Sequence, residues 1–202
     1  MDEDIIRIED ILNILRKRRK MIASITLVAT IFSAIMSFFI IPPKYEASTK
    51  VFIGKENNQV KVQDQTYNNN DVEMYQKLLK TYAEVIETND LVKKAVNLNR
   101  LGLKSQEILS NLKVTPRADT QILEIKYTNG DKILARDILD SITTEFIKST
   151  SELIPNGNVK IIEKVETPED AVSPNKNMNI AIAFFLGLII SIGLSIQTEI
   201  KF

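Results

Sequence analysis

The sequence predicts an α+β fold in which helices pack on a small, about four-stranded sheet and two transmembrane helices flank that domain. Two observations support this prediction. Long uncharged apolar segments lie near both ends of the chain, and between them short segments of alternating apolar residues are interspersed with helical apolar stripes. The 202 residues suffice for one ordinary domain and the two membrane helices, and they are few for two full domains.

The two apolar segments cover residues 21–41, MIASITLVATIFSAIMSFFII, and residues 178–196, MNIAIAFFLGLIISIGLSI. Each is long enough to cross a hydrocarbon layer about 30 Å thick as a helix. We expect the first to remain as an anchor, because the long acidic head before it is unlike a cleavable signal peptide. Gly187 and Gly193 are six residues apart and do not form the GxxxG dimerisation motif, so they predict no helix interface.

A basic cluster directly precedes the first apolar segment and consists of Arg16, Lys17, Arg18, Arg19 and Lys20. Clustered Lys and Arg beside a membrane span stay in the cytoplasm and attract anionic lipid. We therefore expect a two-pass protein with both termini cytoplasmic: a basic, amphipathic segment (1–20), an extracytoplasmic domain (42–177) and a short cytoplasmic tail (197–202). No nucleic-acid partner is expected, because the cluster is short and lacks interleaved aromatic residues.

Upstream of the cluster, Ile5, Ile8, Leu12 and Leu15 recur at helical spacing. This pattern predicts an amphipathic helix that lies on the inner leaflet or packs on a partner. A simple helical extension of the first span explains the same pattern equally well, so both alternatives remain open.

The domain begins where Pro42 and Pro43 end the first membrane helix. From Tyr45 to Ile53 apolar residues alternate with polar ones, which predicts a strand with one buried face. A polar loop is expected over residues 54–70.

Helices follow the loop. Asn70 is expected to cap a long helix that ends near Thr88, and two shorter helices are expected over residues 90–97 and 105–112. Tyr75 and Tyr82 are seven residues apart on the apolar stripe of the long helix, so we interpret them as core residues rather than as sugar-stacking groups.

The second half of the domain predicts two strands, over 113–116 and 121–128, joined by a turn. The NGD stretch, Asn129 to Asp131, should then close the second of these strands and cap a helix that runs to about Leu153, and a strand is expected over 159–166. The first and last strands adjoin the two membrane spans, so we expect them to lie side by side near the membrane.

The approach to the second span is punctuated by Pro168 and Pro174, which should keep residues 167–175 extended. Both membrane-proximal segments are thus marked by proline, and the residues of interest there are Pro42, Pro43, Tyr45, Pro168, Pro174 and Asn175.

Composition excludes several kinds of chemistry. The chain has no cysteine and no histidine, which removes disulfides, thiol nucleophiles and the usual zinc ligands. Its 26 basic and 26 acidic residues balance, so no global charge favours an acidic substrate. We find no clustered carboxylates and therefore predict no catalytic, metal or cofactor-binding residue and no enzyme activity. Arg117, Lys132 and Arg136 are interpreted as surface-solvating charges rather than a glycan site.

Several blocks of the sequence together resemble a known family. They are DEDIIRIEDILNILRKRRK, PPKYEASTKVFI, TYAEVIETNDLVKKAV, LSNLKVTPRADTQILEIKYTNGDKILARDILDSITTEF and VKIIEKVETPEDAVSPNKNMN. In order and spacing they are similar to the chain-length-determinant, or Wzz-type, proteins, also called polysaccharide co-polymerases. The resemblance is narrower to the short Gram-positive members, which act as membrane adaptors for a separate bacterial tyrosine kinase in capsule and exopolysaccharide synthesis.

This resemblance implies a homo-oligomer in the bacterial plasma membrane that works with the polysaccharide polymerase and export machinery and helps to set polymer length. It also implies that the carboxyl-terminal tail engages a cytoplasmic tyrosine kinase. In this chain the tail residues are Gln197, Thr198, Glu199, Ile200, Lys201 and Phe202. So short a tail offers little docking surface. Either the sequence stops short of the full tail, or the amino-terminal helix carries the contact.

The function predicted from the sequence is therefore a non-enzymatic membrane scaffold for capsular or exopolysaccharide biosynthesis that modulates a partner kinase. The alternative is a membrane-anchored sensor or ligand-binding module that signals to a cytoplasmic partner, since the two-span topology fits it equally well.

Overall fold

The computed structural model describes residues 8–55, 69–96, 102–153 and 157–200. The chain divides into two compact units. A helical unit consists of Met1–Pro43 and Ser173–Phe202, and a sheet domain consists of Lys44–Val172. Ile5 and most of the expected loop over 54–70 lie outside the described residues.

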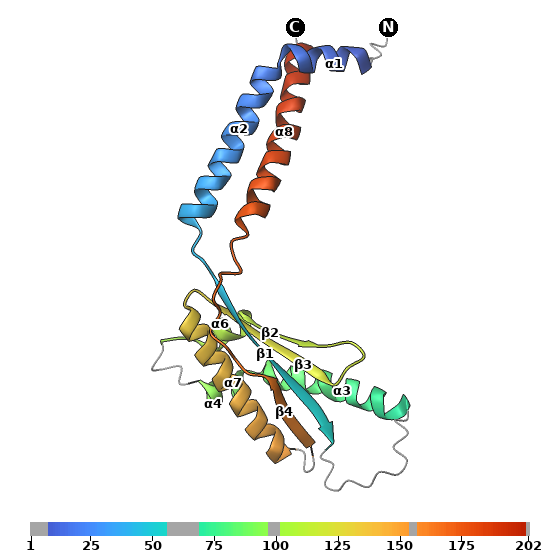
Figure 1. The fold of residues 1–202 in the computed structure, drawn as a ribbon, viewed down its shortest axis with the longest axis vertical. Helices are drawn as coiled ribbons and strands as arrows, with labels where there is room; N and C mark the ends of the chain where they lie inside the picture. Colours follow the sequence, from blue (N-terminus) through green and yellow to red (C-terminus); the bar gives the residue numbers. More distant parts are fainter. Residues whose placement is uncertain (1–7, 56–68, 97–101, 154–156, 201–202) are drawn as a thin grey trace. The chain divides into compact units, whose positions relative to one another are not determined.

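The sheet domain contains an antiparallel sheet whose four described strands are β1 (Tyr45–Lys55), β2 (Leu112–Pro116), β3 (Ile122–Asn129) and β4 (Gly157–Glu163). Their order is β2-β3-β1-β4 (Figure 1). The small four-stranded sheet is thus confirmed, and so is the expectation that the first and last strands are neighbours. Gly54 and Lys55 continue β1, so the expected loop begins later than predicted.

The last strand is shorter than predicted, because β4 ends at Glu163 and not at Glu166. β4 pairs with the carboxyl-terminal half of β1, from Lys50 to Lys55, and the register shifts between Lys50 and Val51. At this bulge the hydroxyl of Thr49 donates to the carbonyl of Glu163 at 2.6 Å. A side-chain hydrogen bond thus lies beside the register shift, at the residue where β4 ends.

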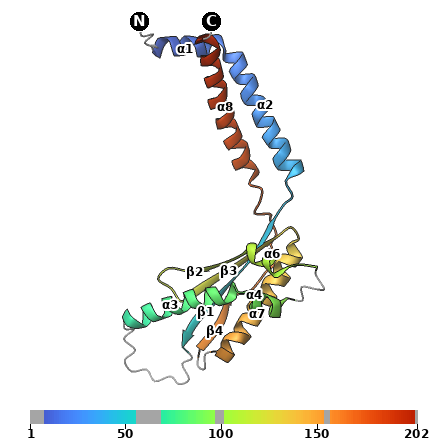
Figure 2. The same cartoon turned by 180° about the vertical axis from the view of Figure 1, so that it is seen from behind.

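Four helices of the described chain cover one face of the sheet: α3 (Asn69–Ile86), α4 (Asn89–Ala95), α6 (Ser105–Ser110) and α7 (Lys132–Leu153) (Figures 1 and 2). Alternate strand residues point into this layer, so Val51, Leu123 and Ile125 are fully buried. Tyr82 of α3 meets Phe146 of α7 edge to face, with ring centroids 5.7 Å apart. The interpretation of Tyr82 as a core residue is confirmed.

The helix starts follow from capping side chains. Asp131 accepts hydrogen bonds from the backbone N–H groups of Ile133 and Leu134 at 2.8 and 3.2 Å, as predicted. Asn70 is not the cap of α3, because that helix already begins at Asn69. Thr88 lies beyond the end of α3 and instead caps α4, where its hydroxyl accepts from the N–H of Leu91.

The helical unit contains α1 (Ile8–Lys17), α2 (Arg19–Ile35), a π-helical turn (Met36–Ile40) and α8 (Lys176–Ile200). The chain changes direction at Arg18, and α1 lies across the end of the α2 and α8 pair (Figure 1). Of the two alternatives for the amino-terminal segment, the structure has the separate helix and not a straight extension of the first span.

Both long helices differ from the predicted spans in their detail. The first was expected to be one continuous helix, but its last turn before Ile41 is a π-helical turn. The second continues to Ile200, so the described part of the expected tail is helical. Over their most apolar windows only 11% and 17% of residues are buried, which is unlike the core helix of a soluble domain.

Candidate functional site

Small and hydroxyl side chains form the contact between α2 and α8. Thr26 and Ser191 approach with their hydroxyl oxygens 3.4 Å apart, and both residues are buried. Gly187 allows the backbones to come close: a Cβ there would lie 3.0 Å from the Cβ of Ala29 and 3.3 Å from the Cα of Thr26. Ser195 is also buried and donates to the carbonyl of Ser191. Small residues that allow close approach are typical of helix contacts in membranes.

The prediction that the glycines mark no interface is wrong for Gly187 and stands for Gly193, which has open space around its Cα. The informative pattern is the four-residue recurrence of Gly187, Ser191 and Ser195, which puts three small residues on one face of the helix. Sequence reasoning missed this stripe because it looked for a second glycine instead of any small residue.

A second polar contact joins the opposite ends of these helices, where the chain enters and leaves the sheet domain. The side-chain amide of Asn179 donates to the hydroxyl of Ser37 at 3.1 Å, and Ser33 donates to the carbonyl of Asn179 at 3.1 Å. Ser37 is buried. The ammonium of Lys176 lies 4.5 Å from the centroid of the Phe38 ring, a cation–π contact. Sequence analysis did not single out any of these residues.

The membrane-proximal residues singled out earlier have distinct local roles. Ile41 is extended, as a residue before proline should be, and the helix ends before Pro42 and Pro43. Asn175 accepts from the N–H of Met178 at 3.1 Å and so caps α8, and the bond between Ser173 and Pro174 is cis.

Within the sheet domain the two chain ends run together. The N–H of Val172 donates to the carbonyl of Lys44 at 2.8 Å, directly before Tyr45 begins β1. Pro168 lies in residues 164–172, which are neither helix nor strand; this agrees with the prediction for residues 167–172, whereas 164–166 were expected in the last strand. The connector to α8 is therefore held beside the start of β1 by a backbone hydrogen bond.

The basic cluster is divided between two helices. Arg16 and Lys17 lie in the last turn of α1, Arg18 is the junction, and Arg19 and Lys20 begin α2. At the other end of the chain, Gln197 and Thr198 are exposed on α8, which also includes Glu199 and Ile200. Lys201 and Phe202 lie outside the described residues.

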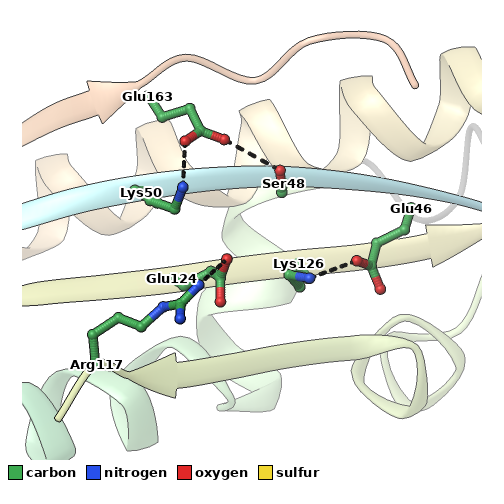
Figure 3. A network of polar contacts seen from close by, with 7 residues as sticks. All are labelled: Glu46, Ser48, Lys50, Arg117, Glu124, Lys126 and Glu163. Atoms are coloured by element: carbon green, nitrogen blue, oxygen red, sulfur yellow. Dashed lines mark hydrogen bonds and ion pairs between the residues drawn. The ribbon is translucent and has the colours of Figure 1, made fainter. Parts of the chain in front are cut away.

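The face of the sheet that no helix covers bears matched charges (Figure 3). The pairs are Lys50–Glu163 at 2.6 Å, Lys126–Glu46 at 2.8 Å and Arg117–Glu124 at 3.0 Å. Each joins two neighbouring strands or the turn beside them, so the pairs support the strand register. Arg117 is thus paired on the sheet and Arg136 pairs with Asp137 on α7, in accord with their interpretation as surface charges.

Glu163 is the most connected residue of this face. Besides the Lys50 ammonium, its carboxylate accepts from the hydroxyl of Ser48 at 3.4 Å. The hydrogen bond from Lys50 is the main cause that lowers the pKa of Glu163 below its ordinary value. Conversely, the hydrogen bond to Glu46 raises the pKa of Lys126. Among the described residues no three carboxylates gather where they could hold a metal ion.

Comparison with known families identifies two matching regions. Residues 4–98 match the family described as chain length determinant protein (Wzz), and residues 138–199 match the family described as G-rich domain on putative tyrosine kinase. The first region contains α2 and β1, and the second contains β4 and α8.

Curated relatives match over nearly the whole chain. A probable capsular polysaccharide biosynthesis protein of Bacillus subtilis is 31% identical over 95% of this chain and 77% of its own length. The capsular polysaccharide type 8 biosynthesis protein of Staphylococcus aureus is 28% identical over 94% of this chain and 84% of its own. A solved structure, the alpha subunit of aIF2 from Pyrococcus abyssi, matches with a TM-score of 0.33 and 15% identity over 64% of this chain and 38% of its own, too low to support an inference.

The length, hydropathy and exposed apolar surface of α2 and α8 indicate a membrane protein. From its similarity to the Bacillus subtilis relative over nearly its entire length, together with the match of residues 4–98, the chain belongs to the chain length determinant, or Wzz, family.

Proposed function

We propose that this protein is a non-enzymatic membrane scaffold for capsular polysaccharide biosynthesis, which regulates polymer length or export and modulates a partner tyrosine kinase. The observation that carries the proposal is that each of the two matched regions includes an apolar helix, α2 in one and nearly all of α8 in the other, besides part of the sheet domain. These helices pack directly on each other through Thr26, Gly187 and Ser191. The relatives are named as capsular polysaccharide biosynthesis proteins, and this is the basis for the proposed pathway.

We place both termini in the cytoplasm and residues 42–177, which include the sheet domain, on the outer side of the bacterial plasma membrane. The basic cluster Arg16–Lys20 beside the start of α2 supports this orientation. The test is simple because the chain has no cysteine. In intact cells, a membrane-impermeant maleimide should label Lys113→Cys, an exposed residue of β2, and should label Asn13→Cys of α1 only after lysis. The reverse pattern would invert the topology.

The kinase contact is proposed for the cytoplasmic end of the helical unit. Two surfaces are available there: the last turn of α8 with Gln197 and Thr198, and the helix α1. Deleting the residues after Ile196 should reduce autophosphorylation of a co-expressed candidate partner kinase if the tail is the contact. If the truncated protein activates the kinase normally, substitution of Asn13 and Arg16 on the exposed side of α1 tests the second surface.

Self-association is also part of the proposal. β4 is an edge strand of the described sheet, and its Ile161 and Ile162 are 43% and 55% exposed. Apolar side chains on an unpaired edge are typical of a surface that meets another chain. Ile162→Lys should lower the oligomer mass of the detergent-solubilised protein, whereas Lys160→Arg on the same strand should leave it unchanged.

The function itself is tested by deletion and complementation. Loss of the gene should change the amount or the length distribution of surface polysaccharide, and the wild-type gene should restore both. Gly187→Leu, which separates α2 from α8, should fail to restore them, and Gly193→Leu, which has space around it, should succeed. An unchanged polymer in the deletion strain would refute the scaffold role.

A further inference from the structure

A groove of about 700 Å³ lies in the helical unit between α1, α2 and α8. Leu15 of α1 and Arg19 of α2 lie at one end, Thr30 and Phe184 at the other, and Leu188 and Ile192 line the wall from α8. Except for Arg19 and two threonines, every residue of the lining is apolar. The volume is within the range of about 300–1,000 Å³ that is usual for small-molecule sites.

The length of the groove corresponds to one membrane leaflet. Its lining on α2 extends from Arg19 to Thr30, which at 1.5 Å per residue is about 16 Å along the helix axis. Half of a hydrocarbon layer is about 15 Å thick. Arg19 and Lys20 begin α2 and the uncharged segment follows at once, so the groove starts at the headgroup level and extends toward the centre of the bilayer.

The lining of the groove suits a hydrocarbon chain, because almost all of it is apolar. A hydrocarbon chain is narrower than a helix and needs no hydrogen-bond partner inside the groove. The hydroxyl of Thr26 is already placed against Ser191, and that of Thr30 donates to the carbonyl of Thr26 at 2.7 Å.

The end of the groove where Arg19 lies favours lipids with an anionic headgroup. Arg19 is exposed, lines the groove and makes no ion pair within the part of the chain that the structure describes. Arg16 and Lys20 nearby are exposed as well. A guanidinium is well suited to bind a phosphate with two parallel hydrogen bonds. An anionic headgroup at this end and an acyl chain in the apolar part would together match the groove in charge, polarity and length.

We propose that this groove is a binding site for one anionic phospholipid of the leaflet that faces the chain termini, with its phosphate on Arg19 and one acyl chain between α2 and α8. The inference rests on α2 and α8 lying in a membrane and does not depend on a role in polysaccharide synthesis. Such a lipid would hold α1 against the two membrane helices, because Leu15 is part of the same wall.

The test uses the full-length protein, reconstituted in nanodiscs of phosphatidylglycerol and phosphatidylcholine and then released into mild detergent for native mass spectrometry. The wild type should retain one phosphatidylglycerol per chain in preference to phosphatidylcholine. Arg19→Gln should reduce this retention about fivefold, the usual effect of one cation near an anionic surface. Ala23→Phe fills the groove from the exposed side of α2 and should abolish the retention of phosphatidylglycerol. Arg16→Gln is the matched control, because Arg16 belongs to the same basic cluster but does not line the groove.

Equal losses in Arg16→Gln and Arg19→Gln would overturn the proposal, because they would show general attraction to anionic lipid. Retention of phosphatidylcholine and phosphatidylglycerol alike would overturn it too. Efficient disulfide cross-linking between two chains carrying Ala23→Cys would show that a second copy occupies the groove instead. Topology labelling of the same variants separates these outcomes from a failure of the helices to insert.

Discussion

The sheet domain and the helical unit bury opposite kinds of residue. In the sheet domain the buried side chains include Phe146, Ile125 and Tyr127, and the charges lie on the open face of the sheet. In the helical unit Thr26 and Ser191 are buried, whereas Phe185 and other large apolar side chains are exposed. Each unit is therefore arranged for its own solvent, water for the sheet domain and lipid for the helical unit. Water drives apolar groups together in the domain, while in lipid the gain comes from close backbone packing and polar contacts between helices.

The two units should differ most when one phenylalanine is truncated in each. Phe146→Ala should lower the free energy of unfolding by about 3–5 kcal/mol, because Phe146 is fully buried against Tyr82. Phe185→Ala should change it by less than about 1 kcal/mol, since Phe185 is 63% exposed on α8. Urea unfolding in detergent, followed by far-ultraviolet circular dichroism, measures both, because both units contain helices. If the two variants lost equal free energy of unfolding, the opposite arrangement of the two units would be contradicted.

A smaller effect is expected from overpacking the contact between α2 and α8. Gly187→Leu forces a side chain into Ala29 and Thr26 and should cost about 1–3 kcal/mol of helix association. The readout is disulfide formation in a chain that carries both Thr26→Cys and Ser191→Cys. The yield should fall in the Gly187→Leu background and stay high with Gly193→Leu, which meets no atom within 4 Å. An unchanged yield would mean that the close approach at Gly187 is dispensable.

Removing the polar contact at the other end of the helices should cost less again. Asn179→Leu loses the hydrogen bond to Ser37, and such bonds in membranes contribute about 0.6 kcal/mol on average. The same cross-linking assay should show a modest reduction, and Asn177→Leu, an exposed neighbour on α8, should show none. A loss as large as that of Gly187→Leu would assign the stability of the pair to this contact instead.

The smallest effect concerns pH and the open face of the sheet. Because the pKa of Glu163 is lowered by Lys50, its stabilising contribution is present above the ordinary glutamate pKa and disappears as the pH falls through the lowered value. Glu163 is 45% exposed, so this contribution stays below about 1 kcal/mol. The wild type should exceed Glu163→Gln in stability at neutral pH and equal it in acid. A pH-independent difference would argue against the ion pair, and Glu169→Gln in the exposed connector should have no effect at any pH.

Much of the fold could be predicted because it depends on local patterns. The alternation from Tyr45 to Ile53 and from Ile122 to Asn129 marks strands with one buried face, and Asp131 is a sufficient signal for the start of α7. The prediction failed where an element's end involves residues that are far away in the sequence. At Glu163, where β4 ends, Thr49 binds the backbone carbonyl and Lys50 binds the carboxylate, and no local pattern in the sequence marks these long-range contacts.

The candidate site was predicted in part. The basic cluster and the proline-marked connectors are visible as composition, and the structure adds that Asn175 caps α8. The role of Gly187 was missed, since a small residue reveals an interface only when its partner is known, and that partner lies on α2. The groove beside Arg19 could not be foreseen either, because three separate helices form its walls.

Two membrane helices around an α+β domain can be predicted from the amino-acid sequence alone, because hydropathy and periodicity are properties of neighbouring residues. The faces that meet are known from the folded structure: Thr26 lies against Ser191, Lys50 pairs with Glu163, and the chain changes direction at Arg18, between α1 and α2. These choices depend on contacts between residues far apart in the chain, whose free energies become defined only once the elements pack.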